Sequence, residues 1–82
     1  MILVDIYVPS LDKTYDFHVD ETVQTEKLIM EIVEMIGNDM KAEKKIEAEK
    51  LLLCSMDQEQ ILNKHGSLQS YGIRNGSRLL LV

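Results

Sequence analysis

The chain has 82 residues, 45% of them hydrophobic and only four aromatic, so any core must be built mainly from aliphatic side chains. A formal net charge of −5 argues against binding to nucleic acid or an anionic membrane surface, because both need concentrated positive charge. A single cysteine, Cys54, excludes an internal disulfide, and no run approaches the ~20 apolar residues of a membrane span. We therefore expect one domain over residues 1–82, located in the cytoplasm and not inserted in a membrane.

The amino-terminal part of the chain predicts an antiparallel β-hairpin. Apolar residues alternate with other residues through 2–8 and again through 14–19, which is the period of a half-buried strand. Pro9 lacks the N–H group that a strand ladder needs, so it ends the first strand. Residues 10–13 then favour a turn, and two alternating runs joined by a short polar loop are typical of a hairpin.

A change in the apolar period after the hairpin predicts a helix. Thr22 is the predicted N-cap, and the neighbouring Asp20 and Glu21 favour the positive end of a helix. Gly37 followed by Asn38 is typical of a helix end. The apolar residues form one wide helical stripe: Leu28, Ile29, Ile32, Val33, Met35 and Ile36. Residues rich in helix formers follow, and they predict a second, mostly solvated helix at about 39–50.

The carboxyl-terminal part predicts short strands joined by turns. The apolar run 51–56 favours a strand, and 61–63 favours a short edge strand. Residues 68–73 predict a helical or 3₁₀ turn, and Asn75-Gly76 a turn into a last strand over 77–82. These elements can form an α+β fold, a mixed sheet of four to five strands packed on one main helix.

The order of elements and several particular residues are similar to a known pattern. Leu68, the run Tyr71-Gly72-Ile73, Asn75-Gly76 and Leu79 look like an ending of the form "L…(C/A)GI.(N/D)G..L". The "YDF" of the second predicted strand and the Thr22-Val23 helix start agree with it. In these features the chain resembles the bacterial ubiquitin-like YukD/EsaB family of type VII secretion accessory proteins, over essentially its whole length. The resemblance implies a ubiquitin-like β-grasp fold.

The resemblance also implies a function. It implies a non-catalytic adaptor of a bacterial type VII (ESX/Yuk-like) secretion system, which acts in the cytoplasm by binding protein and uses no cofactor. The implied partner is the secretion machinery, either the cytosolic portion of its membrane component or an associated ATPase. The charged segment 39–50 departs from the family, so contacts on that side do not transfer.

Two other functions stay open, as does the oligomeric state. A ubiquitin-like modifier or sulfur carrier uses a flexible tail that ends in Gly-Gly, whereas Val82 here continues the predicted last strand, which disfavours this alternative. A generic β-grasp interaction domain of another pathway would show the same pattern. A homo-oligomer is compatible with the sequence but not required by it.

No residue pattern predicts catalysis or metal binding. Cys54 follows three leucines, and its nearest basic neighbour is Lys50, whereas a reactive thiol needs an electropositive setting. His18 and His65 are far apart in the sequence, and no Cys/His spacing resembles a zinc site. We expect both histidines on the surface and a protein that is not an enzyme.

The sequence does predict an apolar surface on the face of the sheet that the helix leaves open. If Leu79 and Leu81 point inward as the family pattern implies, alternation turns their neighbours outward. The resemblance places the strand of Leu52 beside the last strand. The predicted protein-binding residues are Leu52, Leu80 and Val82, with Leu3 and Tyr7 as further outward candidates. The alternative is that segment 39–50 or a loop covers these residues, or that they belong to the core.

Overall fold

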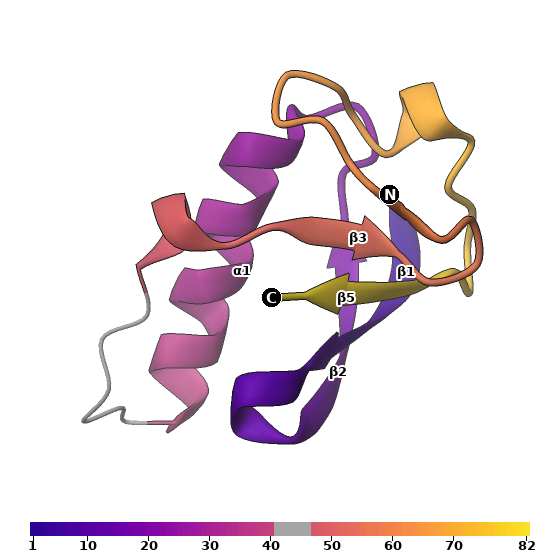
Figure 1. Cartoon of the computed structure of the whole chain (residues 1–82). Coiled ribbons are helices and arrows are strands. Elements are labelled where there is room, and N and C mark those ends of the chain that lie inside the picture. The colour runs from indigo at the N-terminus through magenta and orange to yellow at the C-terminus, as the bar shows by residue number, and fades with distance from the viewer. Residues whose placement is uncertain (41–46) are drawn as a thin grey trace.

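In the described residues, a five-stranded mixed sheet packs one face against the one α-helix, α1 (Figure 1). The structure is a computed structural model, and it describes residues 1–40 and 47–82. The strand order is β2-β1-β5-β3-β4; β1 and β5 are parallel, and the other neighbours are antiparallel. The predicted α+β fold is confirmed. The elements are β1 (Ile2–Val8), η1 (Pro9–Leu11), β2 (Lys13–Val19), α1 (Thr25–Met40), η2 (Ala48–Lys50), β3 (Leu53–Ser55), β4 (Gln60–Ile61), η3 (Gln69–Tyr71) and β5 (Arg78–Leu81).

The predicted hairpin is formed by β1 and β2. Their register runs from Ile2 opposite Val19 to Val8 opposite Lys13. The turn between them is the single 3₁₀ turn η1, which begins at Pro9, and the next residue, Asp12, has a positive φ of 50°. Because the pairing is continuous, one set of alternating side chains points to α1 and the other set points away from it.

The start of α1 differs from the prediction, since the helix begins at Thr25 and Thr22 is not its N-cap. The backbone N and Oγ1 of Thr22 instead donate to Oδ1 of Asp20, at 3.0 and 2.6 Å, and these bonds lower the pKa of Asp20. The first helical N–H groups find distant carbonyl groups. Thr25 N donates to Gly66 O at 2.8 Å, and Glu26 N donates to Lys64 O at 3.0 Å. Carbonyl groups of the loop at Lys64 and Gly66, distant in the sequence, therefore accept from the first N–H groups of α1, which a local cap would otherwise satisfy.

The end of α1 also differs from the prediction. The helix continues through Gly37 to Met40, so the predicted end at Gly37-Asn38 was wrong. A glycine inside a helix costs only about 1 kcal/mol relative to alanine, which packing of the apolar stripe can offset. The predicted second helix at 39–50 falls largely on residues 41–46, which lie outside the described residues. Of its described part, residues 39 and 40 belong to α1, and residues 48–50 form only the 3₁₀ turn η2.

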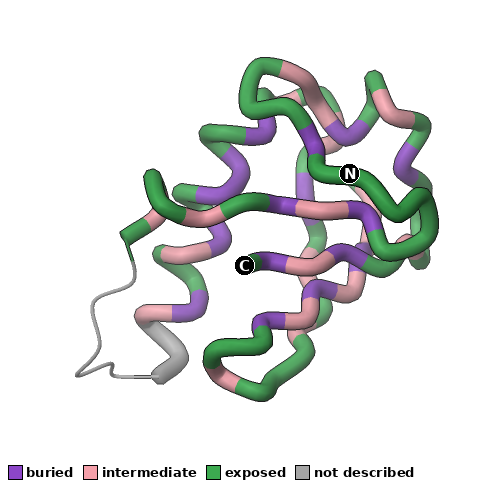
Figure 2. The backbone as a smooth tube through the Cα atoms, viewed as in Figure 1, coloured by how far each residue is buried: buried purple, intermediate pink, exposed green. Residues whose placement is uncertain are grey.

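The core is aliphatic and lies between α1 and one face of the sheet. Figure 2 shows buried residues alternating with less buried ones along β1 and β5. The half-buried Tyr15 and Phe17 of β2 stack on each other, with ring centroids 5.7 Å apart, and pack against this core. The buried hydrophobic residues are Val4, Ile6, Val8, Val19, Leu28, Ile29, Ile32, Ile36, Leu53, Leu62, Leu68, Ile73, Leu79 and Leu81.

The carboxyl-terminal strand β5 lies in the middle of the sheet, between β1 and β3. The turn before it is held by Gly76, which has a φ of +88° and donates its N–H to Leu3 O at 2.7 Å. Strand β3 is shorter than the predicted 51–56, but the pairing continues beyond it. Leu52 N donates to Val82 O at 2.6 Å, and Val82 N donates to Leu52 O at 2.9 Å. Backbone hydrogen bonds thus pair the end of the chain, as far as residue 82, with β3 and the residue before it.

Candidate protein-binding surface

The face of the sheet opposite α1 carries one row of side chains that crosses all five strands. The register pairs Thr14 with Tyr7, Tyr7 with Leu80, Leu80 with Cys54, and Cys54 with Ile61. Residues paired in neighbouring strands point to the same face of a sheet. These five side chains therefore lie side by side, and four of them present carbon or sulfur surface.

Apolar residues that lie two positions before or after Cys54 and Leu80 extend the row. Leu52 and Val82 are 38% and 45% exposed, and Met56 and Ile61 are 43% and 60% exposed. Alternation places Leu52 and Met56 on the same face as Cys54, and Val82 on the same face as Leu80. We call these seven residues the open-face patch: Tyr7, Leu52, Cys54, Met56, Ile61, Leu80 and Val82.

The open-face patch is hollowed rather than flat. Cys54, Met56, Ile61 and Leu80 line a shallow hollow of about 370 Å³. A second hollow of about 210 Å³ lies on the other side of Met56, where Tyr7 forms part of the wall. The two depressions share Met56, and each has room for a side chain.

The structure brings together four of the five predicted residues and sets one apart. Leu52, Leu80, Val82 and Tyr7 all belong to the open-face patch, and the described residues leave Leu52 and Val82 partly exposed. Leu3 lies toward the opposite end of β1, where its backbone N donates to Asn75 Oδ1 at 2.7 Å. Leu3 is therefore not part of the patch.

Three residues of the open-face patch were missed by the sequence reasoning. Cys54 and Met56 follow Leu52 at intervals of two, so the alternation that selected Leu52 also selects them. Ile61 gave no such signal. Its position depends on β4 pairing with β3, where Ile61 lies opposite Cys54, and a register between two short strands is not visible in local sequence.

A charged row separates Leu3 from Tyr7. Asp5 lies between them on β1, opposite Asp16 of β2 on one side and Arg78 of β5 on the other. The hydrogen bond and the negative charge of Asp16 raise the pKa of Asp5 above its ordinary value. Two like charges directly opposite each other repel, so this end of the face carries an excess of negative potential.

Further carboxylates line the two hollows or contact residues that line them. Arg78 N donates to Asp57 Oδ2 at 3.0 Å, and its guanidinium donates to Oδ1 at 3.1 Å, which together lower the pKa of Asp57. The Tyr7 hydroxyl donates to Asp12 Oδ1 at 3.2 Å, and that bond and the charge of Asp12 raise the pKa of Tyr7. Glu59 lines the larger hollow.

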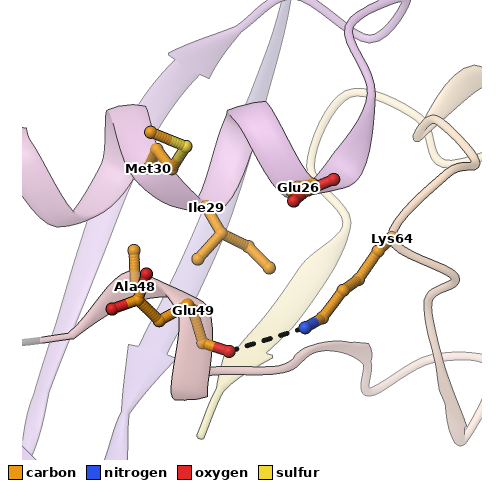
Figure 3. Close-up of a pocket in the computed structure, with 6 residues that line it drawn as sticks. All are labelled: Glu26, Ile29, Met30, Ala48, Glu49 and Lys64. Atoms are coloured by element: carbon orange, nitrogen blue, oxygen red, sulfur yellow. Dashed lines mark hydrogen bonds between the residues drawn. The ribbon is translucent and has the colours of Figure 1, made fainter.

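A smaller hollow of about 130 Å³ lies on the helix side of the molecule, between α1, η2 and the loop before η3 (Figure 3). Ile29 and Met30 line it from α1, and the side chain of Lys64 reaches across to donate to Glu49 O at 3.5 Å. Its size suits a single side chain, and it brings together no nucleophile and base. We do not treat it as a functional site.

The described residues contain no cluster of three or more histidine, cysteine, aspartate or glutamate side chains that could hold a metal ion. His18 and His65 are both exposed, as predicted. Among the helices that the structure describes, none has the length and apolarity needed to cross a bilayer.

Comparison with known proteins decides the family. The family described as "WXG100 protein secretion system (Wss), protein YukD" matches residues 3–81. The chain belongs to the YukD family. This confirms the resemblance drawn from the carboxyl-terminal motif, and the family's description ties it to a secretion system. Among curated proteins, none matches the chain.

Solved structures show that this YukD-family chain has a ubiquitin-like fold. The N-terminal ubiquitin-like domain of the 4931431F19Rik protein has a TM-score of 0.77 at 21% identity, covering 99% of this chain and 72% of that one. A de novo design based on ubiquitin reaches 0.75 at 20% identity, covering 99% and 85%. A protein of Arabidopsis thaliana reaches 0.71 at 21% identity, covering 99% and 83%.

Proposed function

We propose that this YukD-family chain is a non-catalytic adaptor of the WXG100 secretion system, which binds a protein partner through the open-face patch. The partner we propose is the secretion machinery, at the cytosolic portion of its membrane component or at an associated ATPase, so the chain would act in the cytoplasm. The single observation that supports binding is the row from Tyr7 through Leu80 and Cys54 to Ile61, which presents apolar side chains across four strands.

Solvent reaches this row, since Ile61 is exposed and Tyr7, Cys54 and Leu80 are half-buried. Scattered apolar side chains on a surface mean little, whereas a contiguous group with polar surroundings is typical of an interaction site. Ile61 is 60% exposed and would lose that exposed surface on docking. The side chains stand on paired strands, so little backbone ordering is needed when a partner binds.

The surroundings of Cys54 favour binding over thiol chemistry. The described residues that line the larger hollow are uncharged apart from Glu59, and none of them is cationic. A reactive thiolate needs positive charge nearby, and an adjacent carboxylate has the opposite effect. Cys54 in this setting contributes apolar contact surface, as a small hydrophobic residue does.

The proposal is tested by capturing partners from native cells with tagged full-length protein. Ile61→Asp puts a charge into the open-face patch, and Met30→Asp is the matched control, because Met30 on α1 is also 60% exposed. We expect wild type and Met30→Asp to recover components of the secretion machinery, and Ile61→Asp to lose them. Equal recovery by all three proteins would place the contact elsewhere.

The mass of the native protein tests the alternative function. An adaptor is expected to have the mass of the unmodified polypeptide in cells. A covalent adduct with another protein, or a thiocarboxylate at the chain's end, would show a modifier or sulfur carrier and would contradict the adaptor function.

A further inference from the structure

Among the described residues, the charged groups around the two hollows of the open-face patch are mainly carboxylates. Asp5 lines the smaller hollow and lies opposite Asp16, and Glu59 lines the larger one. Asp12 and Asp57 contact Tyr7 and Arg78, which line the smaller hollow. Among the described residues that line the two hollows, Arg78 is the one cation, and Asp57 holds it through its backbone and side chain. The bordering carboxylates are Asp5, Asp12, Asp16, Asp57 and Glu59.

The shape of the face favours a helix over an extended strand as the bound element. Over the patch the sheet offers side chains, because its backbone groups are used in the ladders. An extended segment lying there would leave its own N–H and C=O groups against Leu80 and Ile61 without partners. A helix satisfies its backbone internally and presents only side chains.

The dimensions also suit a helix. Neighbouring strands lie about 4.8 Å apart, so the three steps from Tyr7 to Ile61 span roughly 14 Å. A helix of two to three turns has about the same length. Aliphatic side chains one and two turns apart would reach the two hollows on either side of Met56.

We propose that the open-face patch takes an amphipathic helix of a partner protein, with aliphatic residues on one side and lysine or arginine along both flanks. This inference rests on the proposed function and adds the chemistry of the partner. The aliphatic side chains fill the hollows, and the cations meet the carboxylates of the border. A cation beside Asp5 and Asp16 also relieves the repulsion between those two groups.

The test uses two synthetic helical peptides of about 15 residues, a length at which isolated helices become marginally stable. Both carry leucine at the same positions one and two turns apart, and they differ only in their flanks, which are lysine in one and glutamate in the other. Each is titrated into the ¹⁵N-labelled full chain and followed by amide chemical shifts. We expect the lysine peptide to shift amides of Leu80, Cys54 and Ile61, and the glutamate peptide to leave them unchanged.

Charge variants distinguish binding at the open-face patch from a general attraction of a cationic peptide to an acidic protein. Asp16→Lys with Glu59→Lys changes the border, and Glu31→Lys with Glu34→Lys makes the same change in net charge at exposed positions of α1. We expect the border variant to weaken binding of the lysine peptide at least about tenfold and the α1 variant to weaken it much less. Equal weakening by both variants, or shifts spread over α1, would overturn the inference.

The two proposals can fail separately. If Ile61→Asp abolishes capture of the native partner while neither peptide binds, or while the glutamate peptide binds better, the basic-helix inference is wrong and the adaptor function stands. If the lysine peptide binds at the patch but Ile61→Asp leaves capture intact, the inference about the site stands, and the proposed function of the patch is wrong.

Discussion

Asp5 and Asp16 lie directly opposite each other on β1 and β2, on the face of the sheet that α1 does not cover. Asp16 raises the pKa of Asp5 through a hydrogen bond and its negative charge. A raised pKa means that the folded state binds this proton more tightly than the unfolded state does. The resulting stability is present below the unfolded pKa and is lost as pH rises through the folded pKa.

Asp16→Asn is therefore expected to stabilise the protein at pH 7 by removing the repulsion. The midpoint of thermal unfolding should rise by up to a few degrees at pH 7, and the gain should vanish at about pH 3, where Asp5, whose pKa is raised, is protonated and no longer repels Asp16. Circular dichroism melts at the two pH values check this. A melting point that falls at pH 7, or the same gain at both pH values, would show that the two carboxylates do not repel in the folded state.

Truncation of the helix stripe should be costly. Ile32 is fully buried between α1 and the sheet, so Ile32→Ala is expected to lower the free energy of unfolding by about 2–5 kcal/mol, a large share of the stability of a small domain. Met30→Ala on the exposed side of α1 is the control and should change it by less than about 1 kcal/mol. Urea denaturation measures both, and a small effect at Ile32 would argue against the described core.

Two glycines should respond to alanine in opposite directions. Gly37 lies inside α1, and an added Cβ there would meet nothing within 4 Å, so Gly37→Ala should raise the free energy of unfolding by about 0.5–1 kcal/mol. Gly76 has a φ of +88°, which L side chains rarely adopt, so Gly76→Ala should lower it by about 1–2 kcal/mol. Urea unfolding of both variants checks the pair. A stabilising Gly76→Ala would mean that the turn before β5 is built differently.

Removal of the Thr25 hydroxyl tests the remote capping of α1. Thr25 is fully buried, and its Oγ1 donates to Gly66 O at 3.1 Å. Thr25→Val keeps the side-chain shape and loses that bond, so we expect a loss of about 1 kcal/mol in the free energy of unfolding. Thr25→Ser keeps the hydroxyl, so the amide groups of the loop around Gly66 should stay protected against hydrogen exchange. Unchanged stability in Thr25→Val would show that the backbone bonds alone hold the helix start.

Local periodicity in the sequence was sufficient to predict much of this fold. The alternation in 2–8 predicted β1, and the helical stripe with Leu28 and Ile32 predicted the face of α1 that packs on the sheet. It failed where the deciding partner is distant in sequence. The start of α1 depends on carbonyl groups of Lys64 and Gly66, which no local capping signal reveals.

The same division applies to the open-face patch. Alternation, together with the family pattern that turns Leu79 and Leu81 inward, predicted that Leu52, Leu80 and Val82 point away from α1. Ile61 escaped prediction because its place depends on β4 pairing with Cys54, and Leu3 was included because alternation does not reveal the charged row that separates it from Tyr7. The role of these residues in binding remains a prediction.

The most direct test of binding through the open-face patch is an NMR titration of the ¹⁵N-labelled chain with the partner recovered from cells. We expect the amide shifts to change along Tyr7, Leu80, Cys54 and Ile61, and the exposed face of α1 around Met30 and Glu34 to stay unchanged. Shifts confined to α1, with the four strand residues undisturbed, would contradict binding through the open face of the sheet.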